Sequence, residues 1–178
     1  MKLKQYIVLL IIVFLIVPTV NISAQTKNPD NIKAAFIYNF SKYVSWPGTD
    51  NSETFNIGVI GENRLFPLLE SIAEGKLANK KKILVKQFKN TEEIKDCHIL
   101  LISQSENENL ENILKRVGNK STLTVGDTEK YAEKGVVINF VIMSEKIKIE
   151  LNMEAAERAG LKISSQLQKL AIQVNEKK

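Results

Sequence analysis

Apolar residues recur at helical spacing near the start of the chain, most densely in the stretch KAAFIYNFSKYVSWP (residues 33–47). Placed 100° apart around a helix, these residues and Ile32 cover an arc of roughly 200°, about twice the usual apolar stripe. Pro47 forbids helix beyond Trp46. The pattern therefore predicts a helix that packs on a core with one side. Its other side contacts either a neighbouring loop or a partner protein.

Strand-like and helical patterns alternate through the rest of the chain. The run at 98–102 is continuously apolar, which is typical of a strand covered on both faces. Because so short a turn joins the runs 136–142 and 146–151, they pair as an antiparallel hairpin. The sequence thus predicts an α/β fold: a three-layer sandwich with a mostly parallel central sheet plus a C-terminal antiparallel hairpin strand. The other predicted strands lie at 55–60, 83–88 and 122–125, and the other predicted helices at 62–74, 105–117, 128–134, 152–159 and 164–173.

Residues 1–24 have the pattern of a signal peptide. Two lysines precede an apolar run from Tyr6 to Val17, and Ala24 offers a small residue for cleavage. The run is short for a membrane span of about 20 residues, which favours a cleaved signal over an uncleaved anchor. We therefore expect export to the periplasm and a single α/β domain at 25–178 that does not span the membrane after cleavage.

The charge of the chain says little about its partners. Cleavage would remove two lysines and lower the formal net charge from +5 to +3, which is mild. An exported protein with dispersed lysines is a poor candidate for nucleic-acid binding. We expect no nucleic-acid partner.

Residues that could support catalysis or metal binding are few. Cys97 and His98 are the only cysteine and histidine, and as neighbours in a strand they point to opposite faces, so they cannot share one metal ion. No Gly-x-Ser-x-Gly motif or phosphate-binding loop occurs. The pair Glu92 and Glu93 belongs to one short surface helix rather than to two sides of a cleft. The sequence therefore predicts no catalytic residue, no metal site, no cofactor and no enzyme activity.

Three polar loops follow predicted strands and would meet at the carboxyl edge of the sheet. In open α/β sheets a ligand sits at this edge, and helix starts there can hold an anion. The same polar residues also serve as ordinary helix caps, so both interpretations stay open. The candidate ligand residues are Gly61, Glu62, Asn63, Ser103, Gln104, Ser105, Gly126 and Asp127.

Four stretches, taken in order, are similar to the YfiR-like (DUF4154) family of periplasmic regulatory proteins. They are residues 33–47, CHILLIS at 97–103, LTVGD at 123–127 and AGLKISSQLQKLA at 159–171. The resemblance implies a small α/β regulator outside the inner membrane. The best-known member represses a membrane diguanylate cyclase by binding its periplasmic sensor domain. Some relatives carry cysteine pairs, whereas a chain with one cysteine forms no intramolecular disulfide.

The predicted function is therefore a non-catalytic periplasmic regulator. We expect it to bind the outer domain of an inner-membrane signalling protein, a diguanylate cyclase or a sensor kinase, and to repress it. An alternative is a periplasmic small-molecule-binding protein that uses the carboxyl-edge loops, and a third is an accessory subunit of an outer-membrane or secretion complex. Whether the chain forms a homodimer is left open. The predicted partner-binding residues are Tyr38, Lys42, Tyr43, Trp46 and Pro47.

Overall fold

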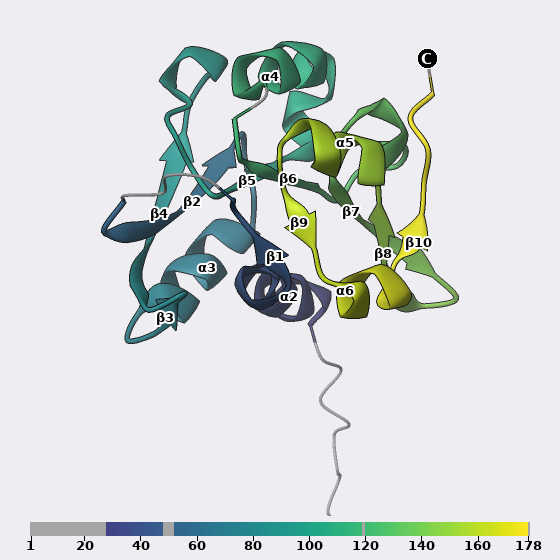
Figure 1. Cartoon of the computed structure of the whole chain (residues 1–178). Helices are drawn as coiled ribbons and strands as arrows, with labels where there is room; N and C mark the ends of the chain where they lie inside the picture. Colours follow the sequence, from purple (N-terminus) through teal and green to yellow (C-terminus); the bar gives the residue numbers. More distant parts are fainter. Residues whose placement is uncertain (1–27, 48–51, 119, 178) are drawn as a thin grey trace, which may run out of the picture.

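A curled sheet of eight strands forms the middle of the computed structural model, which describes residues 28–47, 52–118 and 120–177 (Figure 1). Across the sheet the strands are β10 (Ile172–Gln173), β8 (Lys146–Leu151), β7 (Ile138–Met143), β6 (Leu123–Gly126), β5 (Ile99–Ile102), β2 (Thr54–Ile60), β4 (Lys81–Phe88) and β3 (Leu77–Ala78). The strands from β7 to β4 are mutually parallel, whereas β8 is antiparallel to β7 and β3 to β4. The mostly parallel sheet with a C-terminal hairpin is thus confirmed.

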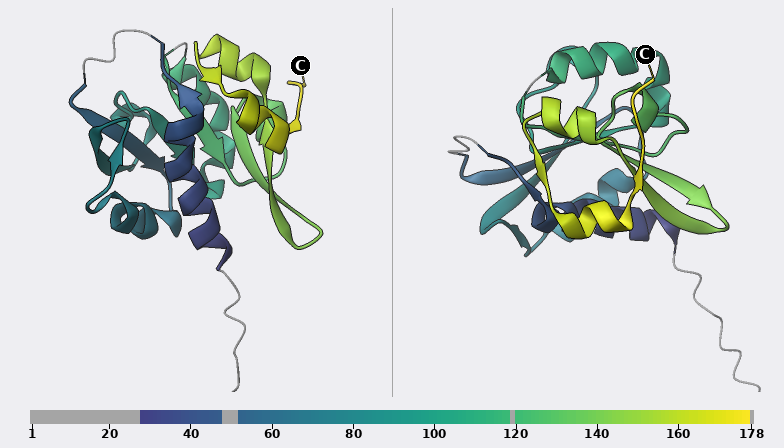
Figure 2. Two further views of the ribbon diagram at one scale, coloured as in Figure 1. Left: turned by 60° about the horizontal axis from the view of Figure 1, so that its bottom comes forward. Right: turned by 45° about the vertical axis from the view of Figure 1, so that its right-hand side comes forward.

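Helices cover both faces of this sheet. Figures 1 and 2 show three layers, with α4 on one side of the sheet and α2, α3 and α6 on the other. Three-residue or six-residue 3₁₀ segments, η1 (Thr91–Glu93), η2 (Gln104–Asn109) and η3 (Ala132–Lys134), join the elements. The three-layer sandwich predicted from the sequence is therefore confirmed. The helices are α2 (Pro29–Tyr43), α3 (Leu65–Ala73), α4 (Leu110–Val117), α5 (Met153–Arg158) and α6 (Ser165–Leu170).

The continuous apolar run becomes the central strand β5, which is buried on both faces. Ile99 and Leu101 belong to the core that also holds α2, while Leu100 and Ile102 belong to the second core under α4. All four side chains are fully buried. Because successive side chains of β5 point to opposite faces of the sheet, this one strand contributes to both cores.

Helix α2 begins one residue after an asparagine cap. The side chain of Asn28 accepts a hydrogen bond from the Asp30 amide at 2.9 Å, and Pro29 takes the first helical position, where its missing N–H costs nothing. Phe40 is 1% exposed and packs in a triangle of rings with Phe36 and Phe140, whose centroids lie 6.5 and 6.0 Å from its own and 6.1 Å from each other. The predicted core-facing side of the helix is thus seated on β7.

The helix ends earlier than its sequence predicts. After Tyr43 the chain becomes the two-residue strand β1 (Val44–Ser45), which pairs with β9 (Lys162–Ile163) in a separate antiparallel sheet. Backbone pairing with a distant segment therefore replaces the last helical turn, and Trp46 lies beyond the helix rather than on its apolar arc. The prediction of helix as far as Trp46 was wrong.

The C-terminal helix is also shorter than expected. Helix α6 ends at Leu170, and residues Ile172–Gln173 form β10 against β8 instead of a final helical turn. The edge of β8 offers unpaired backbone groups, which a periodicity pattern does not reveal. By contrast, the hairpin between β7 and β8 closes tightly, because Ser144 and Glu145 both adopt positive φ, at 49° and 61°.

The predicted signal peptide, at residues 1–24, lies outside the described residues. Within the ranges that the structure describes, no helix combines the length and the apolar character needed to cross a membrane.

Candidate functional site

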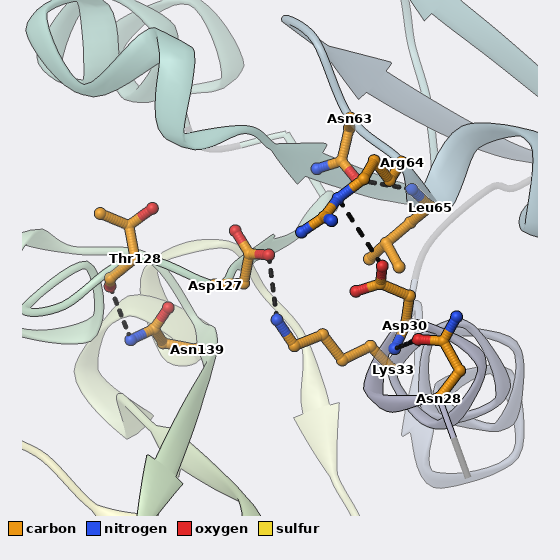
Figure 3. Close-up of polar contacts among 9 residues, drawn as sticks. All are labelled: Asn28, Asp30, Lys33, Asn63, Arg64, Leu65, Asp127, Thr128 and Asn139. Atoms are coloured by element: carbon orange, nitrogen blue, oxygen red, sulfur yellow. Dashed lines mark hydrogen bonds and ion pairs between the residues drawn. The ribbon is translucent and has the colours of Figure 1, made fainter. Parts of the chain in front are cut away.

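Helix α2 spans one face of the sheet and is held at both ends. At the carboxyl edge, where the parallel strands end, the Lys33 ammonium lies 3.1 Å from the Asp127 carboxylate just after β6 (Figure 3). The two side chains are only 12% and 22% exposed. A second, more exposed pair joins Asp30 to Arg64 at 3.7 Å. These contacts fix the start of α2 over the loops that follow β2 and β6.

We expect Lys33→Met to lower the free energy of unfolding by about 1–2 kcal/mol, because it leaves the half-buried Asp127 carboxylate without its partner. The measurement is urea unfolding of both proteins. Lys115→Met is the matched control. The side chains of Lys115 and its ion-pair partner Glu111 are 70% and 80% exposed, so this substitution should change the free energy of unfolding by less than about 0.5 kcal/mol. Equal losses in the two variants would contradict a stabilising contact at the start of α2.

The other end of α2 is held at the amino edge of the sheet, where the parallel strands begin. The Trp46 indole N–H donates a hydrogen bond to the His98 carbonyl at 3.0 Å, and its ring meets Phe55 edge-on at 5.2 Å. The His98 ring stacks on Phe55 at 4.5 Å, and its Nδ1 accepts a hydrogen bond from the Asn56 amide at 3.0 Å. Trp46 thereby connects the end of the α2 segment to β2 and β5.

A cavity of about 620 Å³ opens at this amino edge. It brings together the only tryptophan, cysteine and histidine of the chain. Sequence analysis did not find it, because its walls come from the beginnings of three strands, which carry no shared motif. The cavity is lined by Trp46, Pro47, Ser52, Asn56, Asp96, Cys97, His98, Lys120, Ser121 and Thr122.

Cys97 and His98 point to opposite faces of the sheet, as their adjacency in sequence predicts. Cys97 packs in the core under α4, whereas His98 stacks on Phe55 in the core that holds α2. Burial raises the pKa of the Cys97 thiol to about 12, so the thiolate is scarce at neutral pH. Among the described residues, no three His, Cys, Asp or Glu side chains are grouped to hold a metal ion.

The predicted partner-binding residues separate into two places. Tyr38 and Lys42 lie on the outer side of α2. The ammonium groups of Lys42 and Lys76 lie over the Tyr38 ring, 5.1 and 5.2 Å from its centroid. The Tyr38 hydroxyl donates a hydrogen bond to the Leu77 carbonyl at 3.3 Å, and the Leu77 side chain is 59% exposed. We call Tyr38, Lys42, Lys76 and Leu77 the α2–β3 patch.

The remaining predicted partner-binding residues lie away from this patch. Trp46 and Pro47 line the amino-edge cavity. Tyr43 is half-buried against the core, and its carbonyl accepts a hydrogen bond from the Ser164 amide at 2.8 Å. The aromatic side chains therefore do not form one continuous surface, because the helix ends between them.

The carboxyl-edge loops lie at one edge of the sheet, where those after β2 and β5 hydrogen-bond to each other and Asp127 after β6 pairs with Lys33. The chain order reverses between β2 and β5, which is where such sheets usually hold a ligand. There Ser105 Oγ accepts a hydrogen bond from the Glu62 amide at 3.1 Å, and a Cβ on Gly61 would lie 2.4 Å from the same Oγ. Just before α3, Asn63 Oδ1 accepts a hydrogen bond from the Leu65 amide at 2.8 Å (Figure 3). Ligand binding by these loops stays a prediction.

The remaining predicted ligand residues at this edge differ in their exposure. Gln104 is exposed at the start of η2, whereas Ser103 is buried. Gly126 is buried against the Tyr131 ring, and the Tyr131 hydroxyl donates a hydrogen bond to the Ser103 carbonyl at 3.3 Å. Burial raises the pKa of Tyr131. In the described part of the chain, three buried oxygens have no hydrogen-bond partner: Ser103 Oγ, Thr128 Oγ1 and Asn139 Oδ1.

Comparison with known proteins gives the fold and the family. The chain is similar to the crystal structure of a conserved domain protein from Vibrio cholerae O1 biovar El Tor, with a TM-score of 0.59 and 13% sequence identity. That match covers 83% of this chain and 60% of the Vibrio chain. At such low sequence identity the comparison shows the fold alone. No curated protein matches the sequence.

The family comparison covers nearly all of the described residues. The model of the YfiR/HmsC-like family, DUF4154, matches residues 30–172, from the start of α2 to β10. That range contains all of α2 except Pro29 and all four sequence stretches that resemble the family. The chain therefore belongs to the YfiR/HmsC-like family.

Proposed function

We propose that this protein is a non-catalytic periplasmic regulator that binds the outer domain of an inner-membrane signalling protein, a diguanylate cyclase or a sensor kinase, and represses it. Membership of a family known for periplasmic regulators rather than enzymes supports this function. The observation that carries it furthest is the α2–β3 patch. An aromatic ring, two ammonium groups and an exposed leucine together make a surface suited to another protein.

The Tyr38 ring of the patch is held in place by contacts within the protein. The Tyr38 ring is held by its hydroxyl at Leu77 and by the packing of α2 on the core, so little side-chain entropy remains to be lost on docking. Tyr38 is half-buried, and its exposed part is continuous with Lys42 on the next turn of the helix. This pre-organisation favours α2 as the contact element.

Repression then follows from differential binding. If the regulator binds the inactive state of its receptor more tightly than the active state, it shifts the receptor population toward the inactive state. Release of the regulator reverses the shift. The regulator itself needs no catalytic group for this mechanism.

The proposal is tested by placing a photo-crosslinking residue, benzoylphenylalanine, at Tyr38 of the full chain in living cells. We expect it to capture a membrane protein with a periplasmic domain, identified by mass spectrometry, while the same residue at Glu108 on η2 does not. Tyr38→Ala combined with Lys42→Ala should reduce capture from a neighbouring position at least tenfold, because truncating central contact residues costs about 1 kcal/mol or more each.

Two controls separate docking from folding. Lys169→Ala, an exposed position on α6, should leave capture unchanged. Urea unfolding should show that the Tyr38 and Lys42 variant retains a cooperative transition. Undiminished capture by this folded variant would reject the α2–β3 patch, and capture of soluble periplasmic proteins alone would reject the receptor class.

The amino-edge cavity favours a second candidate function, the binding of a small molecule. It is large enough for a compact ligand and is lined by one aromatic ring and several hydrogen-bonding groups. Trp46 is the only tryptophan, so its fluorescence reports on this cavity alone.

For this candidate we expect a periplasmic metabolite to change Trp46 fluorescence and to raise the melting temperature in the same concentration range. A ligand at 100 times its Kd would add about 2.7 kcal/mol to the free energy of unfolding. A metabolite library that produces neither change would leave the cavity without a role in ligand binding.

A further inference from the structure

Near one side of the sheet, the outer edge of β4 is mostly uncovered. β4 pairs with β2 along Lys82 to Phe88, but on its other side β3 pairs only with Lys81 and Lys82. No other described segment pairs with the outer edge of β4 (Figure 1). Since alternate residues of a strand point their N–H and C=O groups to opposite edges, about half of these groups between Ile83 and Phe88 face outward.

The side chains along this edge alternate between basic and apolar character. Lys82, Leu84 and Lys86 share one face of β4, and Leu84 is 45% exposed. Lys82 and Lys86 form no ion pair among the described residues, and Lys86 lies 5.7 Å over the Phe88 ring. The face therefore presents two ammonium groups on either side of one exposed leucine.

The opposite face of β4 borders an open groove of about 440 Å³. The β4 residues Lys82, Ile83, Leu84 and Val85 line one side of it. The end of α3 and the residues after it line the other side, with Ala73, Gly75 and the acidic residues Glu70 and Glu74. A strand laid beside β4 would place alternate side chains in this groove. Apolar or basic side chains suit that position, whereas acidic ones suit the face with Lys82 and Lys86.

We propose that the outer edge of β4 binds an extended acidic segment of a partner protein as an additional strand. Because Leu77 of β3 already pairs with Lys82, the added strand would run along Ile83 to Phe88. It would carry an apolar side chain next to Leu84, an acidic one next to Lys86, and a second acidic one at its end, within reach of the Lys82 ammonium. Backbone hydrogen bonds would supply most of the affinity, and Leu84 with the ammonium groups of Lys82 and Lys86 would supply the specificity. The inference rests on the proposed function only in requiring that the chain binds another protein.

The charges argue against two other occupants. A second copy of β4 would bring lysines opposite lysines, which is unfavourable across a strand pair. Lysines on an edge strand also protect proteins against such self-pairing, and that protective role alone predicts no binding of any peptide. The experiment below decides between protection and recognition.

The test uses two synthetic eight-residue peptides and the full chain after signal cleavage. Acetyl-TEVIVEVT-amide carries glutamates on either side of isoleucine at alternate positions, and acetyl-TKVIVKVT-amide carries lysines instead. Fluorescence anisotropy of labelled peptides should show saturable binding of the first in low salt, and binding at least tenfold weaker for the second. Absence of saturable binding of the acidic peptide at millimolar concentration would overturn the inference.

Backbone recognition is tested by N-methylation of the acidic peptide. One variant carries N-methyl groups on its odd residues and one on its even residues. Only one set of N–H groups can face β4, so we expect one variant to lose binding and the other to keep it. Equal affinity of the two methylated peptides would mean attraction between charges without strand addition, and would overturn the inference.

The site is mapped with charge-reversed proteins. Lys82→Glu with Lys86→Glu should weaken binding at least tenfold, whereas Lys146→Glu with Lys148→Glu on β8 makes the same change in net charge and should leave it within twofold. Equal weakening by the two pairs would overturn the assignment to β4. So would a dimer in sedimentation that Leu84→Asp dissociates, because it would make a second copy the occupant.

Crosslinking separates this inference from the proposed function. If the receptor is captured from benzoylphenylalanine at Tyr38 but not from the same residue at Leu84, the proposed function is retained and strand addition at β4 is rejected. If the acidic peptide binds β4 and no membrane protein is captured from either position, strand addition stands and the receptor class falls.

Discussion

Replacing Phe40 with alanine is expected to lower the free energy of unfolding by about 3–5 kcal/mol, the largest loss at any single position of α2. Phe40 is 1% exposed, and its ring contacts those of Phe36 and Phe140, which also contact each other, where α2 packs on β7. Its removal would leave a cavity that the rigid sheet on one side and the helix backbone on the other cannot fill. Urea or thermal unfolding measures the loss directly.

Two further variants show whether packing is the cause. Phe40→Leu retains most of the buried volume and should cost less than half as much. Leu170→Ala truncates an exposed side chain at the end of α6 and should change stability by less than about 0.5 kcal/mol. A Phe40→Ala loss no larger than that of Leu170→Ala would mean that α2 is not seated on the sheet as described.

The second large effect is expected for Gly126→Ala at the end of β6. A Cβ at this position would lie 2.5 Å from the Tyr131 ring and 3.2 Å from Asn139 Oδ1. Tyr131 is fully buried and its hydroxyl is bonded to the Ser103 carbonyl, so the ring cannot move away cheaply. We expect a loss of about 3 kcal/mol, at the upper end of the usual cost of overpacking.

A double-mutant cycle isolates this steric cause. Tyr131→Ala removes the Cγ and Cδ2 atoms that the new methyl group would meet, so the double variant should be more stable than the sum of the single losses by about 1 kcal/mol or more. Strict additivity of the two losses in urea unfolding would show that the glycine is required for some reason other than its contact with Tyr131.

Much of the fold could be predicted from the order of apolar residues. The run Ile99–Ile102 is buried on both faces because no polar side chain interrupts it, and the β7–β8 hairpin follows from the shortness of its turn. The resemblance of four stretches to the YfiR-like family was likewise readable without coordinates, and the family match over residues 30–172 confirms it.

The candidate site was harder to predict. Lys33 and Asp127 are 94 positions apart, and nothing in either neighbourhood marks them as partners. The residues of the amino-edge cavity come from three strand beginnings and the segment after β1, which only the folded sheet brings together. The aromatic patch expected around α2 separates into two places because the helix ends at Tyr43.

By itself, the sequence determined the order of most helices and strands and the burial of β5 on both faces, because periodicity in hydrophobicity is a local property of the chain. Only the tertiary structure decided where α2 ends, which segments became β1, β9 and β10, and that the outer edge of β4 is mostly unpaired. The physical reason is that strands pair through backbone N–H and C=O groups. Nearly every residue carries these groups, so their partners are selected by the packing of the whole sheet rather than by any local pattern.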